Sequence, residues 1–192
     1  MAADESSEPG LLDASRVKAA RAGDPAAFEA LVRSVQRPVY GLCLRLLRSE
    51  AESAEVAQET FLRAYQNLGR FDEARPFDIW VLAIARNLCL DLLRRRSKHS
   101  PGPIDDLRDT LASQAPSSED KVIADQQRLT LESAVSLLPP DDREVLALYY
   151  VQKRTTKEIA LVMGVAPGTI MARLFRAREK LRKLLPAEEN LP

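Results

Sequence analysis

Apolar residues recur every three or four positions along most of the chain, which is the period of one buried helix face. In the first half this period predicts four helices, at about 13–21, 26–47, 51–68 and 77–96. In the second half it predicts four more, at about 121–138, 141–151, 156–163 and 167–185. Aromatic residues make up only 5% of the chain, which argues against a sheet-rich fold. We therefore expect an all-α protein.

The helical period stops between residues 97 and 120, a segment rich in Ser, Pro and Asp. Such a composition is typical of a linker. We therefore predict two small helical domains, at 13–96 and 121–185, joined by a flexible linker at 97–120. The ends of the chain, 1–12 and 186–192, are expected to be disordered.

The last two predicted helices lie close together in TTKEIALVMGVAPGTIMARLF, residues 155–175. A short helix, a glycine-containing turn and a longer helix follow one another as in a helix-turn-helix, whose second helix enters the major groove of DNA. An ordinary helical hairpin has the same spacing. The basic character of the second helix favours the DNA-binding alternative.

This second helix has two faces when its residues are placed at roughly 100° intervals. The buried stripe is predicted to consist of Ile170, Leu174, Ala177 and Leu181. The outward face includes Met171, Ala172, Phe175 and Arg176. An outward Phe suits apolar contact with a thymine methyl group in the major groove, although packing against the first domain or simple exposure would also explain it.

Charge is distributed unevenly, although 28 basic residues balance 28 acidic ones in the whole chain. Between Gln152 and Lys183, nine basic residues stand against two acidic ones. A second basic cluster, RRRSK, occupies residues 94–98, and residues 100–126 between the clusters carry six acidic and two basic residues. Segregated basic clusters of this kind indicate contact with a nucleic acid.

Residues that could carry out catalysis are scarce. Cys43 and Cys89 lie in apolar helical patterns without a CxxC spacing, and His99 is the single histidine, so we expect buried free thiols and no metal site. The chain has no glycine-rich phosphate loop and no carboxylate pair with an obvious pocket, so we expect neither an enzyme nor a cofactor. It has no signal-peptide pattern and no run of 18 apolar residues, which predicts a cytoplasmic protein without membrane insertion.

Three segments resemble those of a known family. EVAQETFLRAYQNLGRF (55–71), WVLAIARNLCLDLLRRR (80–96) and TTKEIALVMGVAPGTIMARLFRAREKL (155–181) are similar, in this order, to the core-binding, minus-10-reading and minus-35-reading segments of bacterial sigma factors. The short linker without an intermediate domain resembles the extracytoplasmic function (ECF) group of the sigma-70 family. The resemblance spans about residues 15–185 and implies a subunit that binds core RNA polymerase, recognises a promoter and helps to melt it.

The resemblance also implies which residues make contacts. Core polymerase, through the clamp helices of its largest subunit, would be bound by Glu55, Gln58 and Glu59, and the polymerase flap is a further expected contact. For the single-stranded minus-10 element with its flipped-out base, the candidates are Phe71, Asp72, Arg75 and Asn87, with Arg86, Arg94, Arg95 and Arg96 on backbone phosphates. For the minus-35 element the candidates are Thr169, Arg173, Phe175, Arg176 and Arg178.

Two positions depart from the family pattern. ECF members often carry polar or basic residues where this chain has Met171 and Ala172, so we expect an unusual minus-35 sequence, read partly through DNA shape.

Trp80 could be taken for a strand-separating wedge, but its place in an apolar stripe favours the core. An anti-sigma factor is a common partner in the family and is expected here as a hypothesis.

Two other interpretations remain open. A stand-alone helix-turn-helix regulator would bind duplex promoter DNA without core polymerase. A protein-interaction module would sequester a partner by helix packing, but it leaves the two separate basic clusters unexplained.

Overall fold

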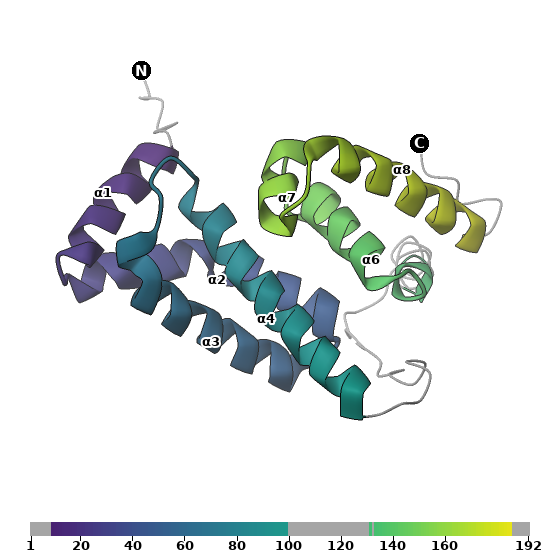
Figure 1. The fold of residues 1–192 in the computed structure, drawn as a ribbon, viewed down its shortest axis with the longest axis horizontal. Helices are drawn as coiled ribbons and strands as arrows, with labels where there is room; N and C mark the ends of the chain where they lie inside the picture. The colour runs from purple at the N-terminus through teal and green to yellow at the C-terminus, as the bar shows by residue number, and fades with distance from the viewer. Residues whose placement is uncertain (1–8, 100–130, 132, 186–192) are drawn as a thin grey trace, which may run out of the picture. The chain divides into compact units, whose positions relative to one another are not determined.

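The computed structural model describes residues 9–99, 131 and 133–185, and all regular structure among them is helical. The order is α1 (Pro9–Arg21), α2 (Pro25–Leu47), α3 (Glu50–Asn67), a 3₁₀ turn η1 (Leu68–Arg70), α4 (Phe77–His99), α6 (Pro140–Leu146), a π-helical turn η2 (Ala147–Val151), α7 (Thr156–Met163) and α8 (Pro167–Leu184) (Figure 1). Of the predicted helix at 121–138, the structure describes residues 131 and 133–138, and of these 131 and 133–136 are helical. The all-α prediction is confirmed.

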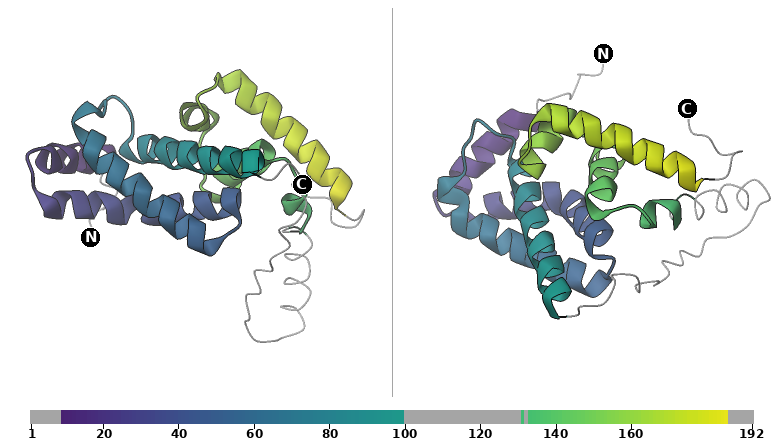
Figure 2. Two further views of the ribbon diagram at one scale, coloured as in Figure 1. Left: turned by 60° about the horizontal axis from the view of Figure 1, so that its bottom comes forward. Right: turned by 45° about the vertical axis from the view of Figure 1, so that its right-hand side comes forward.

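The chain forms two compact units. The first contains α1 to α4, and the second contains α6, η2, α8 and the larger part of α7. In the first unit α2 packs against α1, α3 and α4, and α3 packs against α4, so these helices lie side by side (Figure 2). In the second unit α6 packs against α8.

Capping residues explain several helix boundaries. The Asp24 carboxylate accepts hydrogen bonds from the backbone N–H groups of Ala26 at 2.9 Å and Ala27 at 3.3 Å, and Pro25 fills the first helical position of α2. Ser49 caps α3 in the same way, its hydroxyl accepting from the N–H of Glu52 at 3.4 Å. Donors that the helices leave without partners are thus satisfied locally.

Each unit has its own apolar core. In the first unit the core includes Leu31, Leu42, Leu46, Ile79, Leu82 and both cysteines, which are free thiols as predicted. In the second unit it includes Val145, Leu148, Ile159, Ile170 and Ala177. Tyr65 of α3 is 54% exposed, and its ring makes an edge-to-face contact with Phe28, with ring centroids 4.9 Å apart.

Some predicted boundaries were wrong by a few residues. Helix α4 continues to His99, three residues into the predicted linker, because Arg94 to Lys98 contains good helix formers and the first breaker is Pro101. Helix α1 begins at Pro9, inside the predicted disordered end, and a proline suits a first helical turn. The rest of the predicted linker, 100–120, and most of both predicted disordered ends lie outside the described residues.

Candidate functional site

The helix-turn-helix predicted in the second unit is formed. Helices α7 and α8 are joined by a short turn at which the direction of the chain changes by 101°, an angle within the range of this motif. Gly164 in that turn has a φ of 67°, a left-handed conformation that a glycine adopts easily. A complete capping box starts α7: the Thr155 N–H donates to the Glu158 carboxylate at 2.8 Å, and the Glu158 N–H donates to the Thr155 hydroxyl at 3.3 Å. The start of α7 is therefore determined by neighbouring residues of the sequence.

The two faces of α8 are those that its periodicity predicts. The buried stripe consists of Ile170, Leu174, Ala177 and Leu181. On the outward face Met171 is 63% exposed and Phe175 is 67% exposed. Thr169 lies half-buried in the first turn. The outward face is thus apolar as well as basic, next to the exposed Arg176.

Two arginines that were predicted to touch DNA are engaged within the second unit. The Arg173 guanidinium donates to the Asp141 carboxylate of α6 at 2.9 Å, and its side chain is only 22% exposed. The Arg178 guanidinium lies 5.5 Å from the ring centroid of Tyr149 and 5.4 Å from that of Tyr150. A phosphate or base would have to compete with these partners, so the prediction for Arg173 and Arg178 needs this correction.

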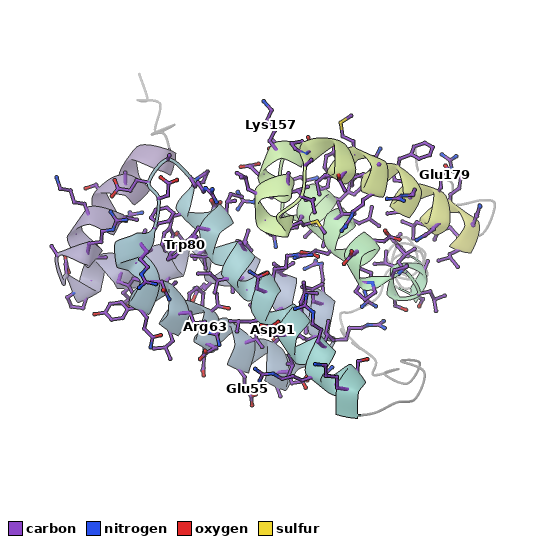
Figure 3. The ribbon with its side chains drawn as sticks, viewed as in Figure 1. Glu55, Arg63, Trp80, Asp91, Lys157 and Glu179 are labelled. Carbon is purple, nitrogen blue, oxygen red and sulfur yellow. The ribbon has the colours of Figure 1, made fainter. Side chains whose placement is uncertain are left out.

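Two further cations of α8 have ion-pair partners, which lie on α6 for Lys180 and within α8 itself for Arg182. Lys180 donates to the Asp142 carboxylate of α6 at 2.6 Å, and Arg182 to Glu179 at 3.2 Å (Figure 3 labels Glu179 on α8 and Lys157 on α7). Arg176 differs, because it is exposed and forms no ion pair with another described residue. It is the arginine of the outward face that is best placed for an external contact.

In the first unit, the aromatic residue that was predicted to stack on a base is buried. Phe71 is only 6% exposed, and its ring centroid lies 4.8 Å from that of Trp80 and 5.7 Å from that of Phe77. The two phenylalanines that bound the loop close over each other and the indole, so Phe71 supports the loop and offers no free ring face. The prediction of Phe71 as a base contact was wrong in this respect.

The polar loop residues are exposed. The Asp72 carboxylate accepts from the Ala74 N–H at 3.0 Å and lies 3.8 Å from the Arg75 guanidinium. Both side chains are more than half exposed, so both are accessible to a ligand.

A shallow depression lies beside this loop, with a volume of about 350 Å³. It is lined by Arg63 and Asn67 of α3, Arg70 of η1, and Trp80, Ile84 and Asn87 of α4 (Figure 3 labels Arg63 and Trp80). The structure thus brings Asn87 together with a half-buried indole, which the apolar stripe had placed in the core. Sequence reasoning missed Arg63, Asn67 and Arg70, although their polar character at helical spacing was a signal.

A side chain far away in sequence holds the loop from behind. The Arg21 Nε donates to the Leu68 carbonyl at 2.9 Å, and its other nitrogens donate to the Phe71 carbonyl and to the Glu73 carboxylate. One residue at the end of α1 therefore ties η1 to the first half of the loop. Sequence reasoning missed this residue too, because its partners lie 47 to 52 positions away.

The basic end of α4 is already paired in part. Arg94 donates to Asp91 at 2.8 Å on the exposed face (Figure 3 labels Asp91), and Arg96 pairs with Glu52 of α3. Arg86 is half-buried and, like Arg95, is not free of contacts. Of these pairs, the exposed Arg94 pair is weak and can be exchanged for a phosphate at little cost.

The predicted polymerase-binding side chains lie along α3. Glu55 and Gln58 are exposed, and Glu59 pairs with Arg63 at 2.7 Å (Figure 3 labels Glu55). The same helix exposes Leu62 and Tyr65 further along. Spacings of three and four residues place Glu55, Gln58, Leu62 and Tyr65 on one face, which is acidic at its start and apolar at its end.

Known proteins share these features. The Sigma-70 region 2 family model matches residues 31–99, and the Sigma-70, region 4 model matches residues 128–181. ECF RNA polymerase sigma factor SigW of Bacillus subtilis is 32% identical over 88% of this chain and 95% of its own length. RNA polymerase sigma-H factor of Pseudomonas aeruginosa is also 32% identical, over 90% of this chain and 93% of its own length.

The chain belongs to the sigma-70 family, in its ECF group. It is therefore a sigma factor, a transcription initiation factor that directs core RNA polymerase to promoters. The region 2 match ends at residue 99, close to Gly102, where the main segment of the first unit ends. The predicted family and its general function are confirmed.

Solved structures have the same fold. The structure of CnrH in complex with the cytosolic domain of CnrY has a TM-score of 0.65 and 25% identity, and covers 92% of this sigma factor and 96% of CnrH. The sigma factor RpoE, in complex with the anti-sigma factor NepR from Bartonella quintana, has a TM-score of 0.67 at 22% identity, and covers 82% of this chain and 95% of RpoE.

Among the residues that the structure describes, no group of three or more His, Cys, Asp or Glu side chains could hold a metal ion. In the same part of the chain, no single helix is long and apolar enough to cross a membrane. Helices α7 and α8 taken together, with the bend between them, are long and apolar enough by length and composition alone.

Proposed function

We propose that this sigma factor reads its promoter with two separate surfaces, a depression for single-stranded DNA in the first unit and a helix face for duplex DNA in the second. The observation that carries the proposal is that each unit presents one such surface, and that the two differ in shape as the two DNA targets do. The sigma factor itself carries out no catalytic step and acts in the cytoplasm.

The depression beside Asn87 suits an unpaired base of the minus-10 element. An unstacked base offers a flat face and a hydrogen-bonding edge. Trp80 supplies an aromatic surface, and the Asn87 amide supplies a donor and an acceptor. Arg63 and Arg70 line the same depression and supply positive charge for the neighbouring phosphates. Asp72 and Arg75 of the adjacent loop are further contacts in this proposal.

The outward face of α8 suits the major groove of the minus-35 element. Arg176 is exposed and can donate two parallel hydrogen bonds to a guanine. Phe175 projects beside it, and Thr169 lies near the start of the helix. Arg173 and Arg178 then act mainly by holding α8 against α6 and η2, with phosphate contact as a secondary role.

Polymerase binding is proposed for the exposed face of α3. Glu55 and Gln58 begin this face, and Leu62 and Tyr65 add exposed apolar area, which is typical of residues that anchor a protein interface. We also propose an anti-sigma factor as a regulator, because RpoE was solved with the anti-sigma factor NepR.

The test is in vitro transcription with purified core polymerase on a pool of promoter fragments. Initiation should require both the sigma factor and core enzyme. Glu55→Lys should weaken binding to core polymerase several-fold, whereas Glu29→Lys, a charge reversal on the exposed part of α2, should not. Specific binding to a duplex promoter without polymerase would support a stand-alone regulator instead, and no core-dependent initiation on any fragment would overturn the proposal.

A further inference from the structure

Two large apolar side chains lie next to each other on the outward face of α8. Met171 is 63% exposed and Phe175 is 67% exposed, and they are one helical turn apart. Ala172 is exposed beside them. Single exposed apolar residues are common, but an adjacent pair at the centre of a DNA-reading face forms a continuous apolar contact surface.

Hydrogen-bond donors on this helix are largely committed elsewhere. Arg173 is bound to Asp141, Arg178 lies over Tyr149 and Tyr150, and Lys180 is bound to Asp142. Arg176 remains as an exposed arginine without an ion pair to another described residue. Base-edge recognition by the exposed part of this helix therefore depends mainly on Arg176, Met171 and Phe175, beside the half-buried Thr169 of the first turn.

Thymine is the base that this set of side chains fits. In the major groove the four base pairs present hydrogen-bonding groups, and thymine adds an apolar 5-methyl group. The surroundings indicate DNA as the occupant of the apolar pair, because nine basic residues against two acidic ones between Gln152 and Lys183 attract phosphates. An acidic or apolar protein partner is the alternative that the experiment separates.

We propose that Met171 and Phe175 select the minus-35 element by contact with the 5-methyl groups of two thymines, with Arg176 reading a nearby guanine. This inference rests on the proposed minus-35 role of α8 and states which bases that role requires.

The experiment starts from a promoter selected by core-dependent transcription from a pool with a randomised minus-35 region. Each thymine of the selected element is then replaced by deoxyuridine, which removes the methyl group and leaves the hydrogen-bonding edge unchanged. Initiation by the unaltered sigma factor should fall about fourfold when deoxyuridine replaces thymine at either of two positions. Burying one methyl group away from water contributes ~0.8 kcal/mol, which corresponds to this fourfold change.

Variants assign each thymine to a side chain. Phe175→Ala should lower initiation on the thymine template about fourfold and abolish the effect of deoxyuridine at one position, and Met171→Ala should do so at the other. Leu184→Ala is the matched control, because Leu184 is an exposed apolar residue at the far end of the same helix and should leave both effects in place.

Three results would overturn this inference. One is a selected element without thymine, and another is equal initiation on thymine and deoxyuridine templates. A third is a loss in Phe175→Ala that is the same on both templates, which would assign the apolar pair to a protein partner. In each of these cases core-dependent initiation still occurs, so the proposed function stands. No initiation on any template would overturn the proposed function together with the inference.

Discussion

The side chains proposed to bind DNA surround a depression in the first unit, whereas in the second they project from one helix. At the depression, α3, η1 and α4 all contribute, and the α1 residue Arg21 holds the neighbouring loop. On α8, Arg173 and Lys180 are bound by carboxylates of α6. Met171, Phe175 and Arg176 remain exposed to solvent. A flipped-out base needs a concave site assembled from distant segments, while a duplex groove needs one rigid convex helix.

The largest effect should come from the stripe that orients α8. Ile170 is fully buried, so Ile170→Ala should destabilise the second unit by about 2–5 kcal/mol through lost burial and a cavity. Hydrogen exchange of α8 amides measures this loss separately from the first unit. The exposed neighbour supplies the control, because Met171→Ala should change stability by less than about 0.5 kcal/mol. Equal losses in both variants would contradict the assignment of the two faces.

Arg21→Ala tests whether the depression depends on the hydrogen bonds that Arg21 of α1 makes to η1 and the loop. Its guanidinium makes three contacts with η1 and the loop, and hydrogen bonds that involve a charged group contribute about 1.5–3 kcal/mol each. Promoter melting should fall at least about tenfold, while binding to minus-35 duplex DNA by the holoenzyme should not change. Lys18→Ala, an exposed substitution on the same helix, should have no effect on either.

Binding of the holoenzyme to a template whose minus-10 region is already open separates loop positioning from strand separation. If Arg21 positions the loop, the variant should bind the pre-opened strand more weakly as well, and Arg21→Lys should restore only part of the binding because it cannot reach all three acceptors. Unchanged binding of the open strand would show that Arg21 has no positioning role.

Arg176→Ala tests the convex surface. Loss of a guanine contact should cost about 1–3 kcal/mol and relax preference at one base position of the minus-35 element. The measurement is initiation on templates that vary one minus-35 base at a time. Lys183→Ala, an exposed cation in the last turn, is the control and should leave base preference unchanged. A loss of the same size on every template would identify Arg176 as a phosphate contact.

Asn87→Ala tests the concave surface in the same way, with a smaller effect. One amide that hydrogen-bonds an unpaired base should contribute about 1 kcal/mol, or about fivefold in melting. The loss should appear with one preferred minus-10 base and disappear with the others. Gln36→Ala removes an exposed amide from α2, away from the depression, and should leave melting unchanged.

Local patterns predicted the helices and the α8 stripe, because periodicity and capping involve residues a few positions apart. Through the family resemblance, Asn87 was predicted as a minus-10 contact, and in the structure it lines the depression. Local patterns failed for Phe71, whose burial depends on closure against Phe77 and Trp80, and for Arg173, whose partner is on α6. Arg21 had no local signal at all. What the sequence pattern cannot indicate is which charged and aromatic side chains tertiary contacts will bind.

The smallest effect concerns the basic end of α4. Arg94 is exposed and its pair with Asp91 is worth at most about 1 kcal/mol, so Arg94→Gln should leave stability nearly unchanged. If Arg94 exchanges Asp91 for a phosphate, the variant should reduce the slope of log affinity against log salt concentration by about 0.7 for single-stranded minus-10 DNA. Arg33→Gln makes the matched control, since Arg33 forms a similar exposed pair with Glu29 on α2. An unchanged slope in Arg94→Gln would show that Arg94 pairs with Asp91 alone and contacts no phosphate. The DNA contacts of the two units would then differ only in the depression and the outward face of α8.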